Sequence, residues 1–158
     1  MINRLKLKDV TDVSEFFSEL PKVNLFDFYI TQNNNRIFLQ NDLKLIKKII
    51  KNQECYGKFK HSNLVGIFII YREKNFRPYL KITAKFLKDV KDLLRFFKWY
   101  YFGKEIYCKL NKKNPIISLL QENGFYKIGD RGTEGNEILL VKKTYKTEKF
   151  NEYSNIKS

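Results

Sequence analysis

The chain has 158 residues, of which 43% are apolar and 16% aromatic, and this composition predicts one folded domain and excludes a disordered protein. Basic residues outnumber acidic ones by 31 to 17, which gives a formal net charge of +14. The longest apolar run, residues 64–71, is far too short to span a membrane, and the charged first ten residues do not resemble a signal peptide. We therefore expect a cytoplasmic protein without a membrane partner. We also expect no metal site, and buried free thiols at Cys55 and Cys108.

The excess positive charge allows more than one interpretation. It comes mostly from lysine, and the chain is also rich in Asn, Ile, Phe and Tyr, a pattern typical of an AT-rich genome. A protein this basic binds polyanions non-specifically at low salt. Charge alone leaves open a nucleic-acid partner, the phosphates of a cofactor, the interior of a virion or simple drift in composition.

The first half of the chain predicts helices that precede a run of strands. Residues 2–8 alternate as a strand does, and a helix capped by Asp9 or Thr11 then runs to Leu20. Residues 22–39 fit no single pattern, although 32–35 reads as a loop. An amphipathic helix follows over residues 42–51. Its outward lysines suit either a solvated face or a nucleic-acid-binding patch, and they are Lys44, Lys47, Lys48 and Lys51.

The middle of the chain predicts three strands and one long helix. Turns at 61–63 and 72–76 separate the strands, which cover residues 55–60, 64–71 and 77–83. The helix covers 86–102, with Phe86 and Leu87 assigned to its apolar side, Asp89 to its outer face, and Gly103 ending it.

The last third contains residues that typically begin and end helices. Residues 105–110 alternate as a strand, Asn114-Pro115 opens a helix, and Gly124 ends that helix directly before Phe125. A hairpin of residues 125–130 and 137–143 follows. Residues 144–158 are polar and predict a C-terminal extension of a single domain that covers residues 1–143.

This order of elements, with the Asn-Pro and Gly-Phe pairs of the last third, resembles the GNAT superfamily of acyl-CoA N-acyltransferases. The resemblance implies an α+β fold with a central mixed, mostly antiparallel sheet and helices on both faces. It also implies that acetyl-CoA or another acyl-CoA lies in a splay between strands 77–83 and 105–110. Its pyrophosphate would then lie at the start of the long helix, where backbone N–H groups can hold an anion.

The family's site residues have only partial counterparts here. The expected cofactor contacts lie at the ends of the two splayed strands and on the elements that follow: Ile82, Thr83, Lys85, Lys88, Asn111 and Asn114. The glycine-rich phosphate loop of the family is missing, because residues 82–88 contain no glycine. Leu120 or Gln121 stands where many members have a tyrosine that acts as the general acid and protonates the departing thiolate. Tyr126 and Glu73 are weaker candidates for the proton-transfer roles.

Two functions remain open after this comparison. The first is a divergent N-acyltransferase that acts on an amine acceptor with acyl-CoA. The alternative is a non-catalytic GNAT-fold module without a cofactor, such as a bacteriophage protein that binds virion proteins or nucleic acid. In that case the protein would be found in the bacterial host cytoplasm or in the virion.

Overall fold

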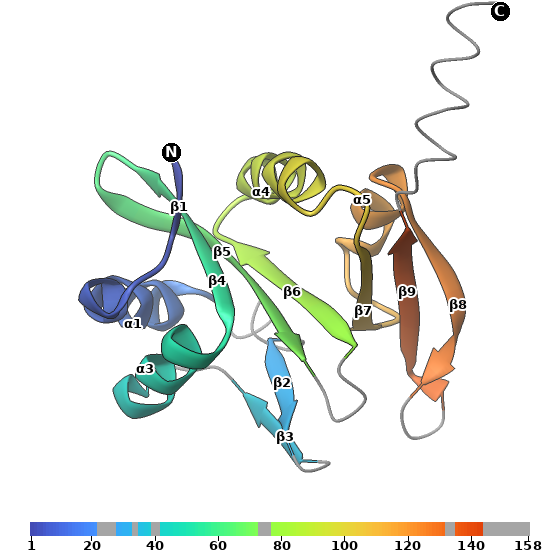
Figure 1. The fold of residues 1–158 in the computed structure, drawn as a ribbon, viewed down its shortest axis with the longest axis horizontal. Coiled ribbons are helices and arrows are strands. Elements are labelled where there is room, and N and C mark those ends of the chain that lie inside the picture. The colour runs from blue at the N-terminus through green and yellow to red at the C-terminus, as the bar shows by residue number, and fades with distance from the viewer. Residues whose placement is uncertain (22–27, 33–34, 39–41, 73–76, 132–134, 144–158) are drawn as a thin grey trace, which may run out of the picture. The chain divides into compact units, whose positions relative to one another are not determined.

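The computed structural model describes residues 1–21, 28–32, 35–38, 42–72, 77–131 and 135–143 (Figure 1). The described chain forms two compact units, of which the first ends at Leu93 and the second begins at Leu94. The border falls inside α4 (Leu87–Tyr100), the longest helix. The expected single domain over residues 1–143 stays a prediction, and the expected extension lies outside the described residues.

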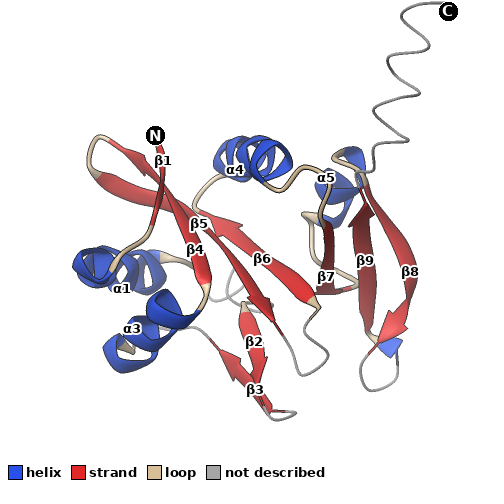
Figure 2. Cartoon of the chain, viewed as in Figure 1, coloured by secondary structure: helices blue, strands red, loops and turns tan. Residues whose placement is uncertain are grey.

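The first unit is a sheet of four antiparallel strands in the order β1-β4-β5-β6 (Figure 2). The strands are β1 (Ile2–Arg4), β4 (Glu54–Lys60), β5 (Asn63–Arg72) and β6 (Pro78–Ala84). β5 is buried along eight consecutive residues, which agrees with the continuous apolar run in its sequence. The expected turn between β4 and β5 is confirmed, and both His61 and Ser62 have positive φ angles, 51° and 67°.

Helices cover both faces of this sheet. The helices α1 (Val10–Glu19) and α3 (Leu43–Asn52) pack against each other and against β5 and β4. Their apolar side chains surround a small apolar cavity that Cys55 and Ile67 also line. On the opposite face, the first half of α4 lies so close to β5 that a Cβ atom at Gly66 would stand 2.8 Å from Leu93 Cδ1.

The segment that fitted no pattern contains a separate hairpin. β2 (Tyr29–Gln32) pairs antiparallel with β3 (Asn35–Phe38), and the two form a sheet of their own. A short 3₁₀ helix, η1 (Leu7–Asp9), also precedes α1. Asp9 stands at the N-cap position of α1, but its carboxylate accepts a hydrogen bond from the backbone N–H of Lys6 instead of capping α1.

The second unit contains a three-stranded antiparallel sheet in the order β7-β9-β8. Its strands are β7 (Glu105–Asn111), β9 (Glu137–Lys143) and β8 (Phe125–Arg131). The helix α5 (Ile117–Glu122) begins later than expected, because Asn114 and Pro115 form a turn in front of it. Gly124 follows α5 with a φ of 96°, which confirms the glycine stop.

Together these elements confirm the predicted fold class. The sheet strands are mostly antiparallel, and helices and strands are mixed along the chain in the expected order.

Candidate functional site

The strand that leads into the expected phosphate site is buried. β6 pairs with β5 in unbroken register from Arg72↔Pro78 to Gly66↔Ala84. Two of the expected contact residues, Ile82 and Thr83, are only 6% and 7% exposed. Their side chains therefore contribute little to the surface that a ligand could contact.

The loop between β6 and α4 exposes apolar side chains. Phe86 is 70% exposed and Leu87 is 55% exposed, so their assignment to the buried side of the helix was wrong. Lys88 is exposed beside them. The carbonyl of Phe86 accepts hydrogen bonds from the N–H groups of Asp89 (3.0 Å) and Val90 (3.4 Å), which closes the first turn. The expected phosphate site thus has a helix start with bulky residues in place of glycine.

Lys85 is tied into the surface of the first unit. Its backbone N–H donates to the carbonyl of Val65 at 2.9 Å, and its ammonium group forms an ion pair with Glu19 at the end of α1. Both side chains of that pair are partly exposed. Pairs of this kind contribute about 1 kcal/mol or less, so Lys85 can exchange Glu19 for a phosphate at little cost.

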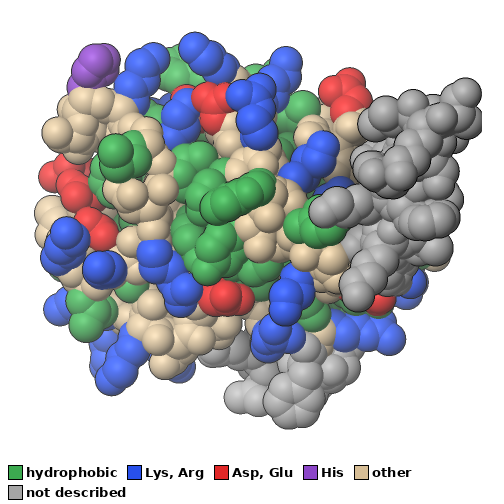
Figure 3. All heavy atoms as spheres, turned by 45° about the horizontal axis from the view of Figure 1, so that its top comes forward, with side chains coloured by type: hydrophobic (Ala, Val, Ile, Leu, Met, Phe, Trp, Pro, Cys, Tyr) green, Lys and Arg blue, Asp and Glu red, His purple; other side chains and the backbone are tan. Residues whose placement is uncertain are grey.

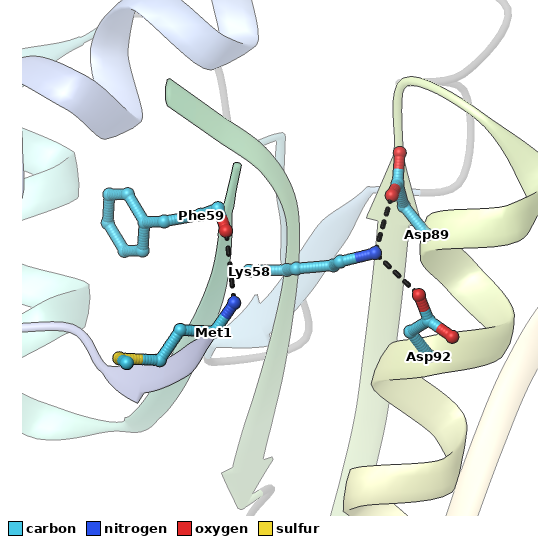
Figure 4. A network of polar contacts seen from close by, with 5 residues as sticks. All are labelled: Met1, Lys58, Phe59, Asp89 and Asp92. Atoms are coloured by element: carbon cyan, nitrogen blue, oxygen red, sulfur yellow. Dashed lines mark hydrogen bonds and ion pairs between the residues drawn. The ribbon is translucent and has the colours of Figure 1, made fainter. Parts of the chain in front are cut away.

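A charged cluster supports the first turns of α4. The ammonium group of Lys58 on β4 lies 2.8 Å from a carboxylate oxygen of Asp89 and 2.5 Å from one of Asp92 (Figure 4). The carbonyl of Phe59, which also lies on β4, accepts a hydrogen bond from the amino group of Met1 at 3.1 Å. The hydrogen bonds to Asp89 and Asp92 raise the pKa of Lys58 above its ordinary value. Lys58 is therefore charged wherever the protein is folded near neutral pH.

This cluster was not predicted from the sequence. Asp89 was expected on the outer face of the helix, whereas it is only 4% exposed. A carboxylate in the first turn of a helix is stabilised by the helix dipole, and this was the available signal. Lys58 gave no comparable signal, since it lies 31 residues away in the sequence.

The charges and side chains at the start of α4 determine how an acyl-CoA phosphate could bind there. Lys85 and Lys88 supply positive charge beside the start of α4, and backbone N–H groups at a helix start favour an anion. The side chains of Phe86 and Leu87 prevent the close backbone approach that glycine permits. The residues present fit a phosphate group held by side-chain charge, and they do not fit a tight backbone cradle.

A second lysine of the first unit is buried outright. Lys81, in the middle of β6, is 1% exposed, and its ammonium group lies 4.0 Å from the centre of the Tyr29 ring. A cation over an aromatic face in a desolvated site is held by about 2 kcal/mol or more. This contact fastens the β2–β3 hairpin to β6, which would carry one side of the expected site.

The asparagines expected near the cofactor have local partners. The side-chain oxygen of Asn111 accepts a hydrogen bond from the N–H of Lys113 at 2.9 Å. That of Asn114 accepts one from the N–H of Ile116 at 3.0 Å. Both therefore stabilise the turn between β7 and α5, and a role in binding a cofactor stays a prediction.

The second unit holds a tyrosine–carboxylate pair that the sequence did not single out as a pair. The hydroxyl of Tyr107 donates to a carboxylate oxygen of Glu105, two residues earlier on the same face of β7. Lys143 lies 3.6 Å from the other oxygen of Glu105. Tyr107 is 8% exposed, whereas the candidate Tyr126 on β8 is 49% exposed. Glu73 lies outside the described residues.

The lysines of α3 form a separate exposed surface. The helix begins at Asp42, whose carboxylate accepts hydrogen bonds from the N–H groups of Lys44 (3.0 Å) and Leu45 (3.2 Å). The side chains of Lys44, Lys47, Lys48 and Lys51 are all exposed. This agrees with a solvated face, and binding of nucleic acid there stays a prediction.

The expected buried free thiols are confirmed. Cys55 and Cys108 are both buried and neither forms a disulfide. Burial raises the pKa of Cys55 to about 12, so its sulfur stays protonated and is a poor nucleophile at neutral pH. Among the described residues, no group of His, Cys, Asp or Glu is arranged to hold a metal ion, and no helix is long and apolar enough to cross a membrane.

Comparison with known proteins gives a clear result for structure and none for sequence. No protein-family model matches the chain, and no curated protein matches it by sequence. Its structure is similar to that of an N-acetyltransferase from Staphylococcus aureus Mu50, with a TM-score of 0.68 and 14% identity over 90% of this chain and 96% of that one. For ribosomal-protein-alanine N-acetyltransferase from Brucella melitensis, the TM-score is 0.67 at 14% identity, with 90% and 99% of the two chains covered.

A third similar structure contains the cofactor. The PaiA N-acetyltransferase from Thermoplasma acidophilum, solved with coenzyme A, has a TM-score of 0.63 and 17% identity over 90% of this chain and 98% of that one. At such low identities the likeness establishes the fold alone. The chain has the fold of the GNAT acetyltransferases.

Proposed function

We propose that this protein binds an acyl-CoA and transfers the acyl group to an amine. The observation that carries the proposal is the extent of the structural likeness, since 90% of the chain superposes on nearly complete acetyltransferases, one of them with coenzyme A bound. Similar structures include enzymes named for alanine, spermidine and aminoglycoside substrates, all of which are amines. An amine is therefore the acceptor class that we propose here.

The start of α4 is the proposed phosphate-binding part of the first unit. Lys88 is exposed at the first turn, and Lys85 can release Glu19 to reach an anion. Lys58 neutralises Asp89, which would otherwise oppose a phosphate at the same helix start. Because side chains replace the backbone cradle, we expect weaker binding of acyl-CoA than a glycine-rich loop would give.

The chain's own groups must then handle the acceptor's proton and the leaving thiolate. Acyl-CoA supplies an activated thioester when bound. Tyr107 carries a proton on its hydroxyl and holds it against Glu105, so this pair is the proposed proton donor and acceptor of the second unit. Tyr126, exposed on β8, is the weaker choice because no described contact fixes its hydroxyl. Positioning of the reactants would supply the rest of the rate enhancement.

Calorimetric titration with acetyl-CoA and with desulfo-CoA tests the binding part of the proposal. We expect Lys88→Ala to weaken binding by roughly three- to fivefold, the effect of about 1 kcal/mol from one exposed charge contact. Lys47→Ala on α3 removes the same charge far from the site in sequence and should leave the affinity unchanged. Absence of binding at millimolar acetyl-CoA would refute the proposal for this donor.

Acyl transfer needs its own assay, in which mass spectrometry detects the acylated product from a panel of polyamines and peptides with free N-termini. We expect Tyr107→Phe to lower the rate of transfer while acyl-CoA affinity stays the same. A rate unchanged by Tyr107→Phe would remove the tyrosine from the mechanism.

A second candidate function is a non-catalytic binding module. It is favoured by one feature, the combination of a glycine-free loop with exposed Phe86 and Leu87 where a cofactor would need close approach. Binding of neither coenzyme analogue would favour this alternative, whose partner would be a virion protein or nucleic acid.

A further inference from the structure

The second half of α4 carries a cluster of aromatic side chains that the fold does not bury. Trp99 is 72% exposed, Tyr100 is 50% exposed, and Phe102 just after the helix is 48% exposed. Phe97 and Tyr101 on the other side of the helix are 1% and 7% exposed and form part of the core. The helix therefore divides its aromatic residues between a buried face and an exposed one.

The exposed rings of Trp99 and Tyr100 contact each other and the half-buried ring of Phe96. Phe96 and Tyr100 stack with centroids 5.7 Å apart and planes only 14° apart. Trp99 leans against both, at 5.9 Å from Phe96 and 6.2 Å from Tyr100. On a helix with 100° per residue, Trp99 lies at the centre of the outer face, between Arg95 and Phe96. We call Phe96, Trp99, Tyr100 and Phe102 the aromatic platform.

The charged residues that surround this platform in the sequence are basic, and the acidic residues Asp92 and Glu105 lie just outside the stretch. Residues 94–104 read LRFFKWYYFGK and contain Arg95, Lys98 and Lys104 but no acidic residue. All three basic side chains are exposed. In the space-filling view, exposed hydrophobic side chains lie beside lysine and arginine side chains and beside some acidic ones (Figure 3).

We propose that the aromatic platform binds single-stranded nucleic acid, with bases stacked on Trp99 and its neighbours and phosphates paired with Arg95, Lys98 and Lys104. Aromatic faces together with a basic surface are the two elements that proteins use to bind single strands without sequence preference. This surface is distinct from the lysine face of α3, which has charge but no exposed aromatic ring among its described residues.

Other occupants fit the same observations less well. A second copy of this chain would bring Arg95 and Lys98 against identical charges. A helix bound at a lipid surface has its basic residues on one face and its apolar residues on the other, whereas here Arg95 lies on the same outer face as Trp99. An acidic protein would satisfy the charges, but it would not account for the exposed aromatic rings beside them.

Trp99 is the only tryptophan of the chain, so its fluorescence reports on this surface alone. We expect a twenty-residue oligothymidine to quench that fluorescence in the full-length protein at about 150 mM salt, and a duplex of equal length to quench it much less. Binding of a labelled oligonucleotide, followed by anisotropy, should weaken about tenfold in Trp99→Ala and recover in Trp99→Phe. The double variant Arg95→Ala/Lys98→Ala should lower the slope of log affinity against log salt by about 1.4.

The matched control is the fourfold alanine variant of Lys44, Lys47, Lys48 and Lys51, which removes more charge from another surface. If the oligonucleotide binds at the aromatic platform, the fourfold variant should lose less affinity for it than Trp99→Ala does. The proposal is overturned if the fourfold variant loses more, if duplex binds as well as single strand, or if polyglutamate quenches Trp99 as strongly as the oligonucleotide does. Self-association that Trp99→Ala abolishes, without any binding of oligonucleotide, would assign the surface to a second copy instead.

Discussion

Replacement of Lys58 by methionine is the sharpest test of how the start of α4 is held. Methionine keeps an unbranched apolar stem of similar length and removes only the charge, so the packing of β4 changes little. The change leaves the carboxylate of Asp89, whose side chain is 6% exposed, without its cation. Asp92 is 30% exposed and can be hydrated instead, so most of the cost falls on Asp89.

The expected loss follows from these exposures. Breaking a fully buried ion pair by removing one partner costs about 3–5 kcal/mol, whereas exposed pairs contribute about 1 kcal/mol or less. Because Asp89 is buried but Asp92 is partly hydrated, the expected cost of removing Lys58 lies at the lower end of the range for buried ion pairs. We expect Lys58→Met to lower the free energy of unfolding by about 3 kcal/mol, which lowers the midpoint of thermal unfolding by roughly 6–12 °C for a chain of this size.

Urea unfolding followed by circular dichroism measures this loss, with Lys60→Ala on the same strand as the control. Lys60 is exposed, so its removal should change stability by no more than about 0.5 kcal/mol. The double variant Lys58→Met/Asp89→Leu should recover most of the loss, because a buried pair replaced by apolar residues is often neutral. A cost below about 1 kcal/mol for Lys58→Met would show that Asp89 is hydrated and would refute the reasoning.

The pH dependence of the same variant has a defined sign. The folded-state pKa of Lys58 is raised, mainly by its hydrogen bonds to Asp89 and Asp92, above the ordinary value of 10.5 that applies to the unfolded chain. The stabilisation is therefore complete below pH 10.5 and is lost as the pH rises through the folded-state value. The stability gap between the original protein and Lys58→Met should be constant from pH 7 to 9 and shrink only in more alkaline solution.

Three further tests address other parts of the first unit by the same unfolding assay. Gly66→Ala should cost about 1–3 kcal/mol, since the new Cβ would lie 2.8 Å from Leu93 Cδ1 and 3.0 Å from Ala84 Cβ, and a neutral result would mean that α4 can move away from β5. Tyr29→Phe should keep most of the contact with Lys81, whereas Tyr29→Leu should lose about 2 kcal/mol more; equal losses would exclude a cation–π contribution. The double change His61→Asn/Ser62→Gly should stabilise the protein by about 1 kcal/mol, because both residues have positive φ, and a loss of stability would contradict the strain argument.

The order of elements could be predicted because local patterns encode it. Period-two alternation marked β7, a continuous apolar run marked β5, and a long amphipathic repeat marked α4. Glycines ended helices where they take positive φ, as Gly103 and Gly124 do. Each of these signals acts within a few residues, so none depends on how distant segments pair.

The segment before α3 shows the limit of such patterns. The β2–β3 hairpin is short, and the sequence around it has neither clean alternation nor a glycine-containing turn. One contact that joins it to the rest of the first unit is between Tyr29 and Lys81, which are 52 residues apart. A lysine within a strand predicts a solvent-facing position, and the aromatic ring of Tyr29 is one contact that favours the burial of Lys81.

The charged cluster of Lys58, Asp89 and Asp92 could not be predicted for a related reason. Glycine is the usual sequence signal for a phosphate site at a helix start, because the backbone there approaches the phosphate closely. In this chain the start of α4 already has an anion of its own, the buried Asp89 carboxylate, and a distant lysine balances it. The helix dipole and one cation can stabilise that carboxylate without any glycine in the loop. Because no close backbone approach is needed in this loop, it tolerates the side chains of Phe86 and Leu87. A ligand at the start of α4 must therefore be held by the side chains around it.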